Sequence, residues 1–249
     1  MSVKIDCVFI HGWAMNSAVW QHGLQQLPPW INPITIDLPG YGVSAGVRAT
    51  TLDDYVDHAA RQITRPSVLV GWSLGGLVSL GLARRHAQLV SALFQVATSP
   101  RFVQAGDWSC AIESSVFEQF AQSLQQDVNR AIRRFLALQV RGTSTSIQTV
   151  RQLQRAIDAH GLPGRVALLA GLKLLSETDL TAQLQALDCS VTWLLGDKDA
   201  LVPVELGDRL AQILTNADIQ ILSGAGHAPM ISHPDEFLQA LLRAAEGVR

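Results

Sequence analysis

Short apolar runs alternate with amphipathic stretches along most of this sequence. A continuous apolar run of about four to eight residues is typical of a buried strand, whereas apolar residues three or four apart are typical of a helix. The apolar runs predict strands at 7–10, 34–36, 67–70, 89–96, 190–195 and 219–222. The stretches between them predict helices at 17–27, 51–62, 77–85, 204–214 and 234–246. This alternation predicts an α/β fold with a mostly parallel, doubly wound sheet.

The strand rhythm stops between residues 101 and 181. Helical spacing of apolar residues, as at Val116 and Phe120, replaces it there. Helices inserted into such an alternation are expected to cover the carboxyl ends of the strands, where doubly wound sheets bind ligands. We therefore expect a core formed by residues 1–100 and 182–249 and a helical cap, or lid, formed by residues 101–181.

A G-x-S-x-G pattern follows the third predicted strand directly. Gly71, Ser73 and Gly75 stand between the apolar run Ser67–Val70 and a helical stretch that begins near Leu77. This context is typical of a nucleophile elbow, in which a strained turn lifts a serine hydroxyl above the sheet. The pattern alone also fits a glycine-rich turn with a solvated serine. A catalytic role for Ser73 therefore depends on whether the sequence supplies a base and an acid for it.

The loops after the last two predicted strands supply those partners. A serine hydroxyl becomes a nucleophile when an imidazole removes its proton, and a carboxylate fixes the imidazole tautomer. Asp199 follows the fifth predicted strand and His227 follows the sixth, which gives the chain order that this topology requires. We predict Ser73, Asp199 and His227 as the catalytic residues. Asp197 is the alternative acid, but a G-x-x-D-x-x-V-P pattern favours Asp199.

Acyl transfer also needs donors for the oxyanion of the tetrahedral intermediate. In this topology they are the backbone N–H of the residue after the nucleophile, Leu74, and that of Trp13, which follows the turn after the first strand. His11 is interpreted as shaping that turn rather than as taking a proton. The side chains of Trp13 and Trp72 are interpreted as pocket wall, with core packing as the alternative for Trp72.

The composition describes an ordinary globular chain. Its 249 residues are 48% hydrophobic, enough for one α/β domain with an insertion. No run approaches the ~20 apolar residues of a membrane helix, and Met1–Ile10 is too short and too acidic at Asp6 for a signal peptide. Cys7, Cys110 and Cys189 are too few for a disulfide framework and lack metal-ligand spacing. We expect a cytoplasmic protein that needs no metal or organic cofactor.

The net charge of −2 hides an uneven distribution. The segment from Val128 to Arg165 contains seven arginines and one acidic residue, Asp158, whereas the rest of the chain has a net negative charge. Arg130 and Arg134 are four residues apart, as are Arg151 and Arg155, so each pair shares one face of a helix. A basic face on an acidic protein favours an acidic partner, although a solvated helix face fits the same pattern.

Several motifs resemble those of the α/β-hydrolase superfamily. They are His11-Gly12-Trp13, the segment 37–44, Gly71-Trp72-Ser73-Leu74-Gly75-Gly76 and Gly226-His227-Ala228-Pro229. More narrowly, the elbow, the segment 134–139 and the segment 227–234 resemble the pimeloyl-[acyl-carrier protein] methyl ester esterases of biotin synthesis. One departure is the short N-terminus, where the leading hairpin of that family is absent, and this leaves the edge of the sheet open to question.

The resemblance implies a cytoplasmic, monomeric carboxylesterase that removes the methyl ester of a pimeloyl group carried by an acyl-carrier protein and releases methanol. It implies no cofactor, nucleic acid or membrane partner. The positions that match the family's substrate contacts are Trp13, Ser73, Leu74, Phe135, Leu136, Ala137, Leu138, Gln139 and His227. Those that match its carrier-binding arginines are Arg130, Arg134 and Arg151, with Arg155 as a substitute because Ile147 and Gln154 stand where the family can have a basic residue.

Two other functions fit the same residues. A general short-chain carboxylesterase, or another hydrolase such as one that cleaves a carbon–carbon bond, would use the same scaffold, since the fold does not determine the substrate. A ligand-binding protein with a vestigial site is the non-enzymatic alternative. The complete set of Ser73, Asp199 and His227 argues against it.

Overall fold

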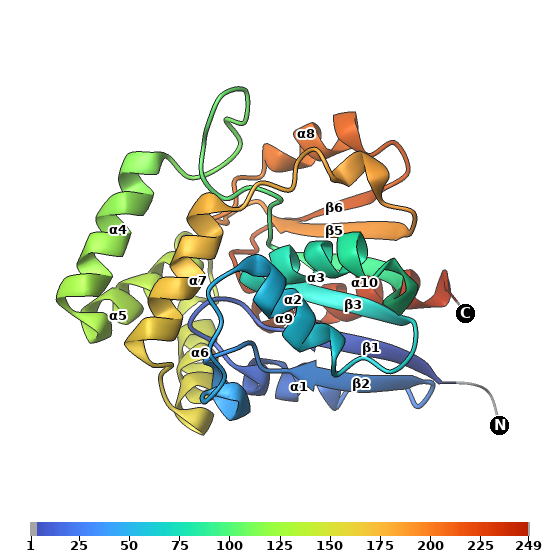
Figure 1. Cartoon of the computed structure of the whole chain (residues 1–249), viewed down its shortest axis with the longest axis horizontal. Coiled ribbons are helices and arrows are strands. Elements are labelled where there is room, and N and C mark those ends of the chain that lie inside the picture. Colours follow the sequence, from blue (N-terminus) through green and yellow to red (C-terminus); the bar gives the residue numbers. More distant parts are fainter. Residues whose placement is uncertain (1–3, 249) are drawn as a thin grey trace.

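The computed structural model describes residues 4–248, and one parallel sheet runs through them (Figure 1). The sheet has six strands in the order β2-β1-β3-β4-β5-β6, and every neighbouring pair is parallel. The strands are β1 Ile5–Ile10, β2 Ile31–Ile36, β3 Ser67–Trp72, β4 Val90–Val96, β5 Ser190–Gly196 and β6 Asp218–Leu222. The predicted α/β fold is therefore confirmed.

Burial explains why some strands have a clearer apolar pattern in the sequence than others. β3 is buried along its whole length, since it lies inside the sheet with helices on both faces. Central parallel strands of this kind have continuous apolar runs. The edge strands β2 and β6 are only partly buried. β2 contains Pro33, which an edge strand tolerates because its missing N–H breaks few sheet bonds. Among the described residues, β2 forms one edge of the sheet. The departure from the family pattern at the N-terminus had put this edge in doubt, and residues 1–3 lie outside the part of the chain that the structure describes.

Helices cover both faces of the sheet. α2 (Leu52–Ala60) and α3 (Leu74–Arg85) pack together on one face, whereas α10 (Pro234–Glu246) lies on the other (Figure 1). α8 (Leu206–Ile213) packs against β6, and α9 (Pro229–Ser232) precedes α10. The prediction of a single helix at 17–27 is wrong. A 3-10 turn, η1 (Ser17–Trp20), and a short α1 (Gln21–Leu24) replace it, because the Asn16 side chain caps a tight turn at its start.

Four further helices lie together beyond the carboxyl ends of the strands (Figure 1). They are α4 Ser114–Gln126, α5 Val128–Gln139, α6 Ser146–His160 and α7 Arg165–Glu177. Residues 101–113 are not helical, contrary to the expectation; they form a loop closed by a bridge between Val103 and Ile112. The division into a core and a cap stays a prediction. No helix within residues 4–248 is long and apolar enough to span a bilayer.

Candidate active site

Ser73 sits in a strained turn between β3 and α3. Its φ of 53° and ψ of −118° lie in a region that residues with a side chain rarely adopt. The flanking glycines allow the close approach of neighbouring backbone: a Cβ on Gly75 would lie 2.2 Å from the Ile10 carbonyl oxygen, and one on Gly71 would lie 2.7 Å from that of Gly75. Thr98 Oγ1 donates to the Ser73 carbonyl at 2.7 Å and helps to hold the turn.

The structure brings Ser73, His227 and Asp199 together. His227 Nε2 lies 2.9 Å from Ser73 Oγ, and His227 Nδ1 lies 2.8 Å from Asp199 Oδ2. A carboxylate only accepts hydrogen bonds, so Nδ1 carries the proton and Nε2 is free to accept from the serine hydroxyl. The other Asp199 oxygen accepts from the backbone N–H groups of Leu201 and Val202 at 2.8 and 3.0 Å. These bonds aim the carboxylate at the imidazole.

Asp197, the alternative acid, has a different environment. Its Oδ1 accepts from the Gly224 backbone N–H at 2.7 Å, and its Oδ2 lies 3.4 Å from Ser223 Oγ. Asp197 therefore joins the loop after β5 to the loop after β6. It holds the loop that carries His227 but does not contact the imidazole.

The main chain of His227 is held on two sides. Its N–H donates to the Gln139 carbonyl oxygen at the end of α5 at 2.9 Å. Its carbonyl oxygen accepts from Trp72 Nε1 at 2.7 Å, which gives the Trp72 side chain a positioning role as well as a place in the core. The backbone that carries the imidazole is thus held by β3 and α5 together.

His11 orients the turn that carries Trp13. His11 Nδ1 lies 2.8 Å from the Gly12 carbonyl oxygen, and His11 Nε2 accepts from the Leu38 backbone N–H at 3.0 Å. Burial lowers the pKa of His11 to about 4, against the opposing effects of the Gly12 carbonyl and the nearby Asp37 carboxylate, so the ring is neutral at pH 7. In a trans peptide the C=O and the next N–H point in opposite directions. By binding the Gly12 carbonyl, His11 therefore fixes the direction of the Trp13 N–H.

The Trp13 side chain connects this turn to α7. Its Nε1 donates to the Leu168 carbonyl oxygen at 2.8 Å. Its ring makes edge contacts with Phe135 and Phe120, at centroid distances of 4.8 and 5.6 Å. Trp13 thus forms part of the wall between the sheet and the helices beyond it.

A cavity of about 230 Å³ opens above Ser73 and His227. Apart from those two residues and two arginines, its lining is apolar, and it includes Phe102, Phe117, Phe120, Phe135, Leu172 and Leu201. Of the predicted substrate contacts, Trp13, Ser73, Phe135, Leu138 and His227 line it. The others do not: Leu74, Leu136 and Gln139 are buried beside it, and Ala137 lines a neighbouring groove.

The predicted carrier-binding arginines lie in different places. Arg134 lines the cavity and Arg151 lines the neighbouring groove, whereas Arg130 is exposed on the first turn of α5. Arg155 lines a separate groove beside η1 and α1, although it stands one helical turn from Arg151. Arg141, which the sequence reasoning did not select, lines both the cavity and the groove. Arg141 is one of the seven arginines of the basic segment 128–165, and its spacing of three residues from Leu138 is compatible with a place on the same side of the helix.

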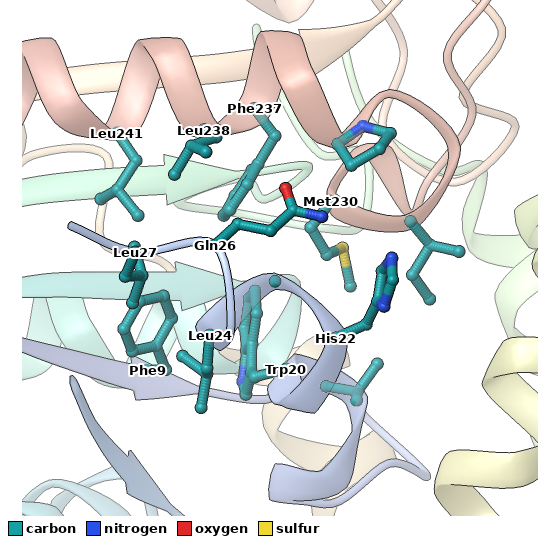
Figure 2. Close-up of a pocket in the computed structure, with 14 residues that line it drawn as sticks. Phe9, Trp20, His22, Leu24, Gln26, Leu27, Met230, Phe237, Leu238 and Leu241 are labelled. Atoms are coloured by element: carbon teal, nitrogen blue, oxygen red, sulfur yellow. The ribbon is translucent and has the colours of Figure 1, made fainter.

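A second, smaller hollow lies between α1 and α10 (Figure 2). Figure 2 shows Phe237, Leu238 and Leu241 of α10 facing Trp20 and Leu24. Its volume of about 20 Å³ holds little more than one water molecule. Neither Ser73 nor His227 lines it, so we place the candidate site in the larger cavity. Among residues 4–248 no cluster of three or more metal-ligating side chains occurs.

Comparison with known proteins shows which family this chain resembles. The model of the alpha/beta hydrolase family matches residues 7–240. Proteins named pimeloyl-[acyl-carrier protein] methyl ester esterase are 40% identical in Sodalis glossinidius (95% of this chain, 91% of that protein) and 37% identical in Vibrio vulnificus (96% and 94%). The structure of a bromoperoxidase from Bacillus anthracis has a TM-score of 0.88 at 18% identity over 98% of this chain and 93% of that one, which shows the fold alone. The chain therefore belongs to the alpha/beta hydrolase family.

Proposed function

We propose that this hydrolase is a serine carboxylesterase that cleaves the methyl ester of pimeloyl-[acyl-carrier protein], releasing methanol, in the synthesis of the biotin precursor. The observation that carries the chemistry is the hydrogen-bonded series Ser73, His227 and Asp199 at the floor of an apolar cavity. The names of the relatives, at 35–40% identity over nearly the whole chain, supply the substrate.

The reaction proceeds by two acyl transfers. His227 Nε2 takes the proton of Ser73 as the serine oxygen attacks the ester carbonyl, and Asp199 stabilises the imidazolium. His227 then gives that proton to the leaving methoxide, and methanol departs from an acyl-serine. A water molecule, deprotonated by the same imidazole, attacks the acyl-serine and releases the free carboxylate, after which Ser73 recovers its proton.

Two backbone groups support the tetrahedral intermediate. The N–H of Leu74 belongs to the first turn of α3, where no helical acceptor exists, and the positive end of the helix dipole lies at the same place. The N–H of Trp13 is directed by the His11 clamp on the Gly12 carbonyl. We assign both as oxyanion donors, each worth about 10²–10³ in turnover.

The carrier protein fits the arginines of the α4–α7 segment. Arg130 and Arg151 are exposed on α5 and α6, and in this proposal they bind an acidic surface of the carrier protein. In this proposal residues 101–181 act as the cap that receives the carrier, and residues 1–100 and 182–249 form the catalytic core of a cytoplasmic monomer. No cofactor takes part in the mechanism.

Methanol release from the carrier-linked methyl ester tests the catalytic assignment. Ser73→Ala is expected to lose at least about 10⁴-fold in kcat, since the nucleophile is removed. Its matched control is Ser115→Ala, an exposed serine on α4. A fluorophosphonate is expected to label the wild-type protein at residue 73 and to leave Ser73→Ala unlabelled. Full hydrolysis by Ser73→Ala would refute the triad.

Charge reversal tests the carrier. Arg130→Glu combined with Arg151→Glu is expected to lower kcat/KM for the carrier-linked ester about tenfold at low salt and less at high salt, because the attraction is screened. Hydrolysis of a free methyl ester serves as the internal comparison. Equal activity toward free and carrier-linked esters would favour the general short-chain esterase. Restoration of biotin-independent growth in a strain that lacks its demethylating esterase would support the proposed substrate.

A further inference from the structure

Two buried aromatic side chains join the loops after β1 and β2 to α7. The Trp13 Nε1 donates to the Leu168 carbonyl oxygen at 2.8 Å, and the Tyr41 hydroxyl donates to the Ala167 carbonyl oxygen at 3.2 Å. Ala167 and Leu168 are consecutive, so both bonds reach the same turn of α7, which lies beyond the carboxyl ends of the strands (Figure 1). The Tyr41 ring also packs against that of His11, at a centroid distance of 5.3 Å.

The backbone of the loop after β1 is strained next to the proposed oxyanion donor. Ala14, which follows Trp13, has a φ of 61°, in the left-handed region that residues with a side chain rarely adopt. Such a conformation persists only where its surroundings hold it. Burial raises the pKa of Tyr41, whereas a hydrogen bond from the Ala14 backbone N–H lowers it. The Tyr41 oxygen thus lies between the Ala14 N–H and the Ala167 carbonyl and joins the strained turn to α7.

Gly171 allows both aromatic side chains to approach α7. It stands one helical turn after Ala167, on the same side of the helix. A Cβ on Gly171 would lie 2.5 Å from the Tyr41 hydroxyl oxygen and 2.7 Å from Trp13 Cδ1. A helix interior favours alanine over glycine, so a glycine here serves the packing of Tyr41 and Trp13 rather than the helix itself.

Neither Tyr41 nor Gly171 lines the cavity above Ser73, although α7 contributes Leu172 and Leu175 to its wall. A substrate in that cavity therefore does not touch either residue. A substitution at Tyr41 or Gly171 can change the reaction only through the residues that they hold in place. This separates them from residues whose side chains line the cavity.

We propose that Tyr41 and Gly171 are positioning residues for the oxyanion site. By packing the loop after β1 against α7, they hold the Trp13 backbone N–H in the direction that the tetrahedral intermediate requires. This inference rests on the proposed function, because Trp13 is an oxyanion donor only in that mechanism. The α4–α7 segment then holds the base and the oxyanion donor alike, since α5 binds the His227 backbone and α7 binds Trp13.

Tyr41→Phe tests the hydroxyl, because it removes that group and keeps the ring. We expect kcat for p-nitrophenyl butyrate to fall about tenfold while KM stays within about twofold. This loss is smaller than the roughly 10²–10³ of a deleted oxyanion donor, since the Trp13 N–H is misdirected but still present. The matched control is Tyr55→Phe. Tyr55 is equally buried, its hydroxyl has no hydrogen-bond partner among residues 4–248, and its kcat is expected to equal that of the wild type.

Gly171→Ala tests the close approach of α7. To restore ordinary contact with the new Cβ, Tyr41 and Trp13 have to move by roughly 1 Å, and a misplacement of that size lowers turnover by about 100-fold. The control is Gly207→Ala in α8, where an added Cβ meets its nearest atom at 3.6 Å. The kcat of Gly207→Ala is expected to equal that of the wild type.

A trifluoromethyl ketone reports on the oxyanion site directly. It adds to Ser73 as a tetrahedral hemiketal whose oxygen takes the place of the oxyanion, so its affinity follows transition-state stabilisation. In Tyr41→Phe and Gly171→Ala we expect its inhibition constant to rise by the factor by which kcat/KM falls. The matching methyl ketone, which stays trigonal, is expected to keep its affinity within about twofold. A general loosening of the fold would weaken both ketones alike.

The outcomes separate this inference from the proposed function. Unchanged kcat and trifluoromethyl ketone affinity in Tyr41→Phe would overturn the role of Tyr41, as would an equal loss of kcat in Tyr55→Phe. Equal kcat in Gly171→Ala and Gly207→Ala would overturn the role of Gly171. A higher KM at constant kcat in either variant would assign the effect to substrate binding and overturn the positioning role. If the wild type neither hydrolyses an ester nor binds the trifluoromethyl ketone, the proposed function itself fails.

Discussion

The Gln139 carbonyl oxygen, at the end of α5, accepts the backbone N–H of His227 at 2.9 Å. The imidazole proposed as the general base is therefore positioned partly by a helix outside the sheet. The preceding residue, Gly226, passes so close that a Cβ on it would lie 2.5 Å from the same oxygen. α5 and the His227 loop can keep this bond only while residue 226 has no side chain.

Gly226→Ala is expected to separate α5 from the His227 loop and to lower kcat by about 100-fold, the size of effect that a displacement of about 1 Å has on catalytic geometry. Steady-state kinetics on a free methyl ester measure it. The control is Gly23→Ala in α1, where a Cβ meets no atom within 4 Å. Unchanged kcat in Gly226→Ala would show that this contact does not position the imidazole.

Asp199→Asn and Asp197→Asn, both in the loop after β5, are expected to differ in their effect on kcat. Asp199→Asn is expected to lower kcat by about 10³–10⁴, because the amide no longer holds the His227 tautomer that leaves Nε2 free to accept a proton. Asp197→Asn is expected to stay within about tenfold of the wild type, since Asp197 bonds the Gly224 N–H rather than the imidazole. The reverse ranking would assign the orienting acid to Asp197.

His11 is expected to affect turnover without touching the substrate. His11→Ala frees the Gly12 carbonyl, so the Trp13 N–H loses its fixed direction, and kcat is expected to fall by about 10–100-fold with a smaller change in KM. His11→Asn supplies a new side-chain N–H and is expected to restore part of the loss. If His11→Ala raises KM and leaves kcat intact, the clamp acts on binding and not on the oxyanion.

The buried His11 side chain is expected to make the free energy of unfolding depend on pH. Burial lowers the pKa of His11 to about 4 in the folded protein, whereas an unfolded histidine takes up its proton near pH 6.5. Between these values the unfolded chain binds more protons, so the free energy of unfolding falls as the pH is lowered from about 6.5 to about 4. Urea unfolding at several pH values measures this slope. His11→Asn is expected to flatten it, and an equal slope in both proteins would contradict the prediction.

Local sequence pattern was enough for the central part of the fold. The run Ser67–Val70 predicted a buried strand because both faces of β3 are covered by helices. The segment 101–113 shows the limit, since its apolar residues were assigned to helices but form a bridged loop. Periodicity over so short a segment does not separate a helix from a loop that packs its apolar side chains against neighbouring elements.

For the candidate site, local sequence pattern predicted the strained turn at Ser73 and the chain order Ser73, Asp199, His227. Glycine spacing around Ser73 and the strand ends before Asp199 and His227 are local properties, and parallel strands bring their carboxyl ends to one edge. The bond from the His227 N–H to the Gln139 carbonyl was visible only in the folded protein, as was the placement of Arg141 at the cavity and of Arg155 at another groove. These contacts depend on how helices far apart in the sequence pack against the sheet and against one another. A backbone carbonyl has no side-chain signature, and the direction of an arginine on a helix follows from what that helix is packed against.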